Sequence, residues 1–138
     1  MKHALILEKD EESSTKVSRV LGWLGYVTAP VQTPEQALNV ASAIKFDVII
    51  TCTAKTPDDR RSLTGELKRA APEAALILIS DKEINVDTSL SQCPGISAVV
   101  KRPPSFDVLR HIVEFGIDGS GLQLTYLPVL HERRRKHL

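Results

Sequence analysis

Short apolar runs of strand length alternate with longer segments of helical spacing along most of the chain. The clearest run is 75–80, and the others are 4–7, 26–29, 47–51 and 96–100. The longer segments carry apolar side chains three or four residues apart, which is typical of a helix with one buried face. These side chains are Val17, Val20, Leu21 and Leu24, then Ala37, Leu38, Ala41 and Ile44, then Leu63 and Leu67, and finally Val108, Leu109, Ile112, Val113 and Phe115.

This alternation predicts an α/β fold. Each crossover is long enough for a helix, and strands joined in this way lie parallel, with helices on both faces of the sheet. An open sheet of five strands most often has the flavodoxin-like order 2-1-3-4-5, so we expect a three-layer sandwich of that kind. The segment 81–92 is polar and only weakly helical in its spacing.

Local signals indicate where the first two helices begin and end. Ser13 or Ser14 could cap the first helix, and Gly25 fits the position just past its end. Thr33, followed by a proline, predicts the cap of the second helix. Trp23 lies next to the apolar face of the first helix, so we expect it to be partly buried.

Length, charge and cysteine content exclude several classes of protein. The 138 residues suit one domain, which we expect at 1–117, with a C-terminal extension at 118–138. A net charge of +1 gives no overall attraction to nucleic acid or to an anionic membrane. The two cysteines lack metal-ligand spacing and fit a reducing cytoplasm, and no apolar run approaches the roughly 18 residues of a membrane span. We therefore expect a cytoplasmic protein without membrane contact, whose folded domain does not bind nucleic acid directly.

The C-terminal extension has a composition of its own. Its stretch 122–130 is apolar enough that it should pack on the domain or on a second copy. The basic run 133–136 could bind phosphate groups or an acidic partner, although a solvated chain end is the simpler interpretation.

In an open parallel sheet the functional crevice lies beyond the carboxyl ends of the strands. The third strand has an unusual end, because it runs into Thr51, Cys52 and Thr53, and no carboxylate lies between Asp47 and Asp58. The other segments expected at this edge are 8–10, 80–81 and 101–103.

Over about residues 1–116 the chain resembles a response-regulator receiver (CheY-like) domain. Receivers carry an acidic pair after the first strand and a phosphoacceptor aspartate after the third. They carry Thr or Ser after the fourth strand and Lys-Pro after the fifth. Glu8 matches the first acid, Lys9 falls where the second should be, and Asp10 comes one position late.

The remaining positions of the family's site also depart from its pattern. Cys52 matches the phosphoacceptor position by its spacing from the start of the strand, with Thr53 as the alternative. Ser80 matches the hydroxyl position, and Arg102 fits the lysine position best, with Lys101 as its neighbour. The resemblance therefore implies a degenerate receiver, or pseudo-receiver. The segment 102–106 further resembles the degenerate receiver of flagellar master regulators of the FleQ/FlrA type.

Aspartyl phosphorylation needs a carboxylate nucleophile, a magnesium ion and a fixed cation. Glu8 and Asp10 could offer carboxylates to magnesium, which prefers hard oxygen ligands. Lys9, however, places a cation beside them and could pair with Glu8 in place of the metal's charge. The thiol of Cys52 is a soft and poor magnesium ligand. We expect no cofactor, weak or absent magnesium binding, and no aspartyl phosphorylation.

The preferred interpretation is a non-enzymatic module in signal transduction or transcriptional regulation. It would act without phosphorylation, by binding a protein partner or by forming a homodimer. By the resemblance, the dimer face would include Val108, Arg110, His111 and Glu114.

Two alternatives stay open. One is a phosphorylatable two-component response regulator with a shifted acidic site in an unusual loop arrangement, using Glu8, Asp10 and Asp58 or Asp59. The other is a ligand-sensing domain that holds a small molecule in the crevice.

Several of these residues also have purely structural interpretations. Free cysteine is among the most buried residue types, so packing is the simpler role for Cys52. A redox role would need a cation nearby, such as Lys9 or Arg102. Ser80 could simply end its strand, and the four histidines are too scattered to indicate a metal site.

Overall fold

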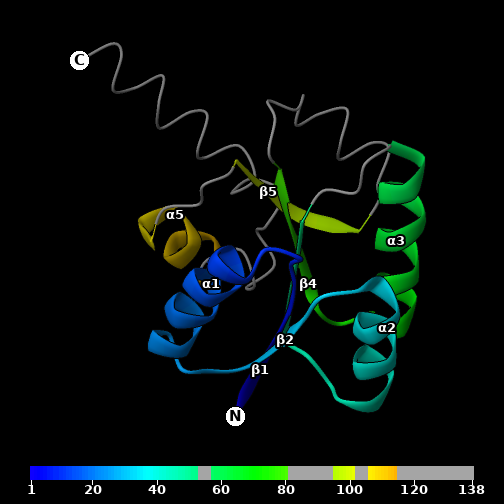
Figure 1. The fold of residues 1–138 in the computed structure, drawn as a ribbon. Helices are drawn as coiled ribbons and strands as arrows, with labels where there is room; N and C mark the ends of the chain where they lie inside the picture. The colour runs from blue at the N-terminus through cyan, green and yellow to red at the C-terminus, as the bar shows by residue number, and fades with distance from the viewer. Residues whose placement is uncertain (53–56, 81–94, 102–105, 115–138) are drawn as a thin grey trace.

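Figure 1 shows the computed structural model of the chain, which describes residues 1–52, 57–80, 95–101 and 106–114. The weakly helical segment 81–92, Phe115 and the C-terminal extension therefore lie outside the described residues, as does the expected domain boundary. Within the described ranges, no helix is both long enough and apolar enough to cross a membrane.

The strands of the described part form one parallel sheet of order β2-β1-β3-β4-β5. This confirms the predicted fold class and strand order. Each crossover leads from one parallel strand to the next, and such connections need a dozen or more residues. The strands are β1 (Lys2–Leu7), β2 (Tyr26–Val31), β3 (Val48–Cys52), β4 (Ala75–Ser80) and β5 (Ile96–Lys101).

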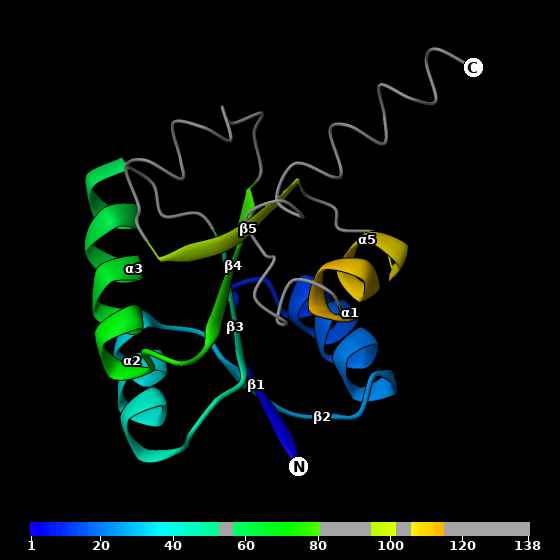
Figure 2. The same ribbon diagram turned by 180° about the vertical axis from the view of Figure 1, so that it is seen from behind.

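Helices cover both faces of the sheet, as Figures 1 and 2 show from opposite sides. In β3, Val48 and Ile50 belong to one apolar core, whereas Ile49 belongs to the other. Successive side chains of a strand point to opposite faces, so one continuous apolar run fills both cores. The helices on the first face are α1 (Glu11–Trp23) and α5 (Phe106–His111), and those on the second are α2 (Pro34–Ala43) and α3 (Pro57–Ala70).

The two ends of α1 differ in how well the sequence predicted them. The predicted cap at Ser13 or Ser14 is wrong, because Asp10 caps the helix. The carboxylate of Asp10 accepts hydrogen bonds from the backbone N–H of Ser13 at 3.0 Å and from its hydroxyl at 2.8 Å. The other end is as predicted: Gly25 follows the helix with a φ of +93°, a backbone conformation that glycine adopts without strain.

The apolar faces of α1 and α2 are also only partly as predicted. Val17, Val20 and Leu21 are buried as expected, but Trp23 is 75% exposed. The expectation of a partly buried Trp23 is wrong, because this residue ends α1 where the helix leaves the core. Ile44 is likewise exposed, since α2 ends one residue earlier and the backbone of Ile44 is extended.

Asp47 joins three strands at the amino edge of the sheet. Its carboxylate accepts a hydrogen bond from the backbone N–H of His3 at 2.8 Å, and its own N–H donates to the carbonyl of His3 at 2.9 Å. Its carbonyl accepts from the N–H of Ala75 at 3.0 Å. The aspartate before β3 is therefore a structural residue, and it lies at the end of the strand opposite to the crevice.

Candidate site at the carboxyl edge of the sheet

The parallel register brings four strand ends to one edge of the sheet. Cys52, the last residue of β3, pairs with Ile79, and Ser80, the last of β4, pairs with Lys101, the last of β5. The structure describes the backbone of these positions but not the side chains of Cys52, Ser80 and Lys101, and Thr53 and Arg102 lie outside the described residues. The backbone thus gathers the predicted positions Glu8, Cys52, Ser80 and Lys101.

Glu8 is a buried carboxylate at this edge, with 7% of its surface exposed. It follows Leu7, which pairs with the buried Thr51 of β3. The Oε1 atom of Glu8 accepts a hydrogen bond from the N–H of Asp10 at 3.2 Å, and the N–H of Glu8 donates to the carbonyl of Val31 at 3.1 Å. Because a buried carboxylate is costly without donors, the hydrogen bond from the N–H of Asp10 helps to explain why it is tolerated here.

Lys9 and Asp10 do not behave as the sequence suggested. Lys9 is exposed, and within the described part of the chain it makes no ion pair with Glu8. The Lys9–Glu8 pair that the sequence allowed is therefore not formed, and an exposed ammonium keeps its hydration instead. Asp10, the late acid, uses its carboxylate to cap α1.

The alternative phosphorylation site, built from a shifted set of acids, also needs residues that lie elsewhere than expected. Asp58 and Asp59 belong to the first turn of α3, which begins at Pro57, and not to an unusual loop. Proline is favoured at the first position of a helix, which explains why the helix begins there. Among the described residues, no group of three or more His, Cys, Asp or Glu side chains could hold a metal ion.

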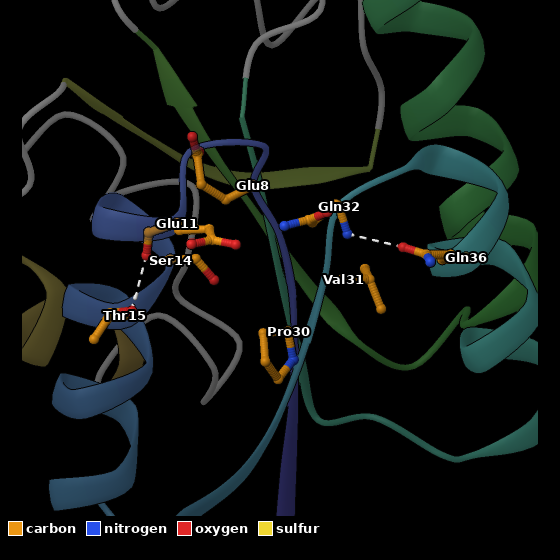
Figure 3. A pocket seen from close by; sticks show the side chains of 8 residues that line it. All are labelled: Glu8, Glu11, Ser14, Thr15, Pro30, Val31, Gln32 and Gln36. Atoms are coloured by element: carbon orange, nitrogen blue, oxygen red, sulfur yellow. Dashed lines mark hydrogen bonds between the residues drawn. The ribbon is translucent and has the colours of Figure 1, made fainter.

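Beside Glu8 lies a polar pocket of about 390 Å³, seen in Figure 3 between the start of α1, the end of β2 and the start of α2. Ser14 lines it and is only 9% exposed, yet within the described part its hydroxyl makes no hydrogen bond. Gln36 is held in place, since its Oε1 accepts from the N–H of Gln32 at 3.0 Å. The lining residues include two carboxylates and no cation: Glu8, Glu11, Ser14, Thr15, Pro30, Val31, Gln32 and Gln36.

This pocket was missed at the level of sequence, although a signal for it exists. In the order 2-1-3-4-5, β1 and β2 are neighbours, so the residues that follow them meet at one edge. The adjacency of the two strands would therefore have been enough to assign the polar residues at the start of α1 and around Gln32 to one pocket.

The residues expected at a dimer face lie on or just beyond α5. Arg110, His111 and Glu114 are exposed, whereas Val108 is partly buried and packs against the core. Three of the four positions are therefore accessible to a partner.

Several solved structures share this architecture. A response regulator protein from Burkholderia pseudomallei, whose crystal contains a phosphorylated aspartic acid, a calcium ion and citrate, matches with a TM-score of 0.76 at 18% identity; the match covers 95% of this chain and 75% of that one. A CheY-like receiver domain from Methanospirillum hungatei JF-1 matches with a TM-score of 0.75 at 18% identity, over 89% of this chain and 98% of that one. This chain has the receiver fold.

The similarity to these solved receivers is one of structure at low sequence identity. A response regulator from Thermotoga maritima has a TM-score of 0.76 at only 14% identity, over 86% of this chain and 99% of that one. No protein-family model matches the sequence, and no curated protein matches it. The backbone positions of Glu8, Cys52 and Ser80 lie at the edge where open parallel sheets carry their functional crevice, but the chemistry there depends on the residues themselves.

Proposed function

We propose that this chain is a pseudo-receiver: a module of two-component signalling that accepts no phosphoryl group and acts through contact with a protein. The observation that carries the proposal is the end of β3. The strand ends at Cys52, in the place where the family's resemblance puts the phosphoacceptor aspartate. No carboxylate occurs anywhere in residues 48–57 that could take over the role.

The neighbouring residues support the same interpretation. The Burkholderia pseudomallei protein is described with a phosphorylated aspartic acid and a calcium ion, so the fold can host that chemistry when the acids are in place. In this chain Lys9 puts a positive charge at the second acidic position, and the carboxylate of Asp10 caps α1. A divalent cation that prefers carboxylate oxygens thus has Glu8 as its main remaining ligand, which favours weak binding.

A titration with magnesium and beryllofluoride, followed by the backbone amide signals in NMR spectra, tests the proposal. We expect no saturable movement of the amide signals of Glu8, Cys52 and Ser80, because no acceptor carboxylate is present to bind the phosphoryl analogue. Magnesium-dependent shifts at these residues, or covalent labelling near β3 by acetyl phosphate, would overturn it.

Restoring the acids provides a matched control for that experiment. The double variant Lys9→Asp/Cys52→Asp carries a carboxylate at both altered positions, so it should gain a magnesium-dependent response to beryllofluoride. The single variant Lys9→Asp should bind magnesium more tightly than the parent chain. Its amide signals should still not respond to beryllofluoride, since it lacks the acceptor carboxylate at position 52.

A second candidate function, the sensing of a small polar ligand, is favoured by the pocket beside Glu8. Ser14, a residue only 9% exposed, lines this pocket, and in the described part of the chain its hydroxyl makes no hydrogen bond. A thermal-shift panel of nucleotides and small amines tests it. A concentration-dependent rise in melting temperature that Ser14→Val removes would support it, and a flat response would count against it.

A further inference from the structure

Ser14 brings a nearly buried hydroxyl to the pocket between α1, β2 and α2. The residue is 9% exposed, and the pocket that it lines has a volume of about 390 Å³. In Figure 3 its side chain points from α1 toward Pro30, which lies on the opposite wall of the pocket. Within the described part of the chain the hydroxyl has no hydrogen-bond partner, so it is available to a bound molecule.

Packing alone does not explain this hydroxyl. A serine or threonine inside a helix often donates to the carbonyl one turn back, as Thr15 does to Glu11 at 2.8 Å. The carbonyl one turn before Ser14 is that of Asp10, and it accepts from the N–H of Ser14 at 2.9 Å but not from the hydroxyl. A buried hydroxyl without a partner is costly, so alanine would fill this position of α1 at a lower cost.

The charge of the lining favours a cation. Glu8 and Glu11 both line the pocket, and no lysine or arginine does. Glu11 lies three residues before Ser14 and hence on the same side of α1, and Figure 3 shows the two side chains next to each other. Within the described residues the carboxylate of Glu11 forms no hydrogen bond or ion pair. The pocket therefore attracts a positively charged group.

Two helices begin at the pocket, and the amino end of a helix generally favours an anion. Here, however, the helix caps already use several of the backbone donors. The carboxylate of Asp10 accepts from the N–H of Ser13 at 3.0 Å, and the hydroxyl of Thr33 accepts from the N–H of Gln36 at 3.2 Å. The side chain of Gln36 in turn accepts from the N–H of Gln32. An anionic ligand would find few free donors and two carboxylates.

We propose that this pocket binds a small primary amine. Its ammonium group donates to the carboxylate of Glu11 and to the hydroxyl of Ser14, and its methylene groups lie against Pro30 and Val31. This rests on the second candidate function, the sensing of a small polar ligand, and names the chemical class of that ligand. An ammonium group has three donors and no acceptor, which suits a wall of carboxylate and hydroxyl oxygens. Ligand pockets span roughly 300–1,000 Å³, and this one lies near the lower limit, so the ligand is small.

A titration of the full chain with putrescine, followed by the backbone amide signals in NMR spectra, tests the proposal. Putrescine carries an ammonium group at each end of a short methylene chain. Butanediol and succinate have the same carbon chain, but the first is neutral and the second is negatively charged. We expect saturable shifts of the amide signals of Ser14 and Gln36 with putrescine alone. Equal shifts with butanediol, or shifts only with succinate, would overturn the proposal.

Two serines of α1 give a matched pair of variants. The hydroxyl of Ser18, one turn after Ser14, is also buried without a partner in the described part, but Ser18 does not line the pocket. Ser14→Ala should raise the dissociation constant of putrescine about fivefold, as expected for the loss of one hydrogen bond. Ser18→Ala should leave it unchanged. Isothermal titration calorimetry measures both, equal urea midpoints exclude unfolding as the cause, and equal effects of the two variants would contradict the proposed site.

Two neighbouring glutamates test the charge in the same way. Glu11→Gln should weaken the binding of putrescine on the order of threefold, because a partly exposed ion pair is lost. Glu12→Gln removes the same charge one residue away, but Glu12 pairs with Lys16 at 3.5 Å and does not line the pocket. It should have no effect at physiological salt, where exposed charges are screened. If Glu12→Gln weakens binding as much as Glu11→Gln, the attraction is general and the proposed site is wrong.

The outcomes separate this proposal from the functions on which it builds. If putrescine does not bind, but a nucleotide raises the melting temperature in a way that Ser14→Val removes, the amine proposal fails and the sensing function stands. If the chain responds to no compound of either kind, both fail. Neither result decides the pseudo-receiver proposal, because the response to magnesium and beryllofluoride tests that one separately.

Discussion

Single residues at the carboxyl edge have roles that their spacing alone did not reveal. Asp10 was expected as a late member of an acidic pair, but its carboxylate accepts hydrogen bonds from Ser13, three residues later, and caps α1. Spacing along the chain counts residues, whereas a cap depends on where the helix begins, and here it begins at Glu11. Glu8, by contrast, was placed correctly at the edge, because a strand end is defined by its own apolar run.

Replacing Asp10 tests whether its carboxylate acts as the cap of α1. Asp10→Ala should lower the free energy of unfolding by about 1 kcal/mol, because it removes the acceptor for Ser13 at the start of α1. Asp10→Asn keeps an acceptor oxygen and should cost clearly less. Urea denaturation followed by circular dichroism measures both, and equal losses in the two variants would contradict a capping role.

Asp47 provides a second test at the scale of one residue. Asp47→Ala should destabilise the fold by about 2 kcal/mol, since hydrogen bonds to a charged acceptor contribute more than neutral ones and the N–H of His3 would lose its acceptor. Asp47→Asn should recover part of that loss. Amide hydrogen exchange at His3 should rise in Asp47→Ala, and an unchanged exchange rate would argue against the contact.

At the scale of an element, the ends of the helices depend on glycine and proline more than on the apolar pattern. Gly25 ends α1 with a positive φ, and Pro57 begins α3. Gly65 is different, because it lies inside α3 with open space beside its Cα atom. The same residue type therefore stabilises one helix end and weakens another helix interior.

Substituting the two glycines by alanine should have opposite effects. Gly25→Ala should lower the free energy of unfolding by about 1 kcal/mol, because a side chain with Cβ is strained at positive φ. Gly65→Ala should raise it by roughly 0.5–1 kcal/mol, because alanine restricts the unfolded chain and suits a helix interior. Thermal unfolding measures both, and changes of equal sign would contradict this account.

On the scale of the whole molecule, one sheet joins two apolar cores. Adjacent residues of β3 serve different cores: Ile50 packs under α1 and α5, and Ile49 packs under α2 and α3. Both residues are almost completely buried. Because the two cores share the strands, a loss of packing in either one weakens the same sheet.

Conservative truncation on each face of the sheet tests whether the two cores unfold together. Ile49→Val and Ile50→Val should each cost about 1 kcal/mol, as expected for the removal of one buried methylene group. Since the two side chains point into different cores, the double variant should lose about the sum, with a coupling below ~0.5 kcal/mol. A single urea transition in all three variants is expected, and two separate transitions would show that the cores unfold independently.

The sequence by itself determined the strands, the fold class and the absence of a carboxylate at the end of β3. Apolar runs such as Ala75–Ser80 can satisfy their backbone and side chains only within a covered parallel sheet, so the pattern and the structure agree there. The strand order was expected only because 2-1-3-4-5 is the commonest order of a five-stranded open sheet, whereas the edge at Glu8 follows from the parallel direction of the strands.

Only the tertiary structure decided which neighbours the side chains meet. The pocket beside Ser14 arises because β2 returns to lie next to β1, and the contact of Trp23 with Phe106 joins residues far apart in the chain. A helical pattern shows which face is apolar but not where the core beneath it ends. Trp23 therefore looked like a packing residue in the sequence, whereas the fold placed it on the surface, where it is 75% exposed.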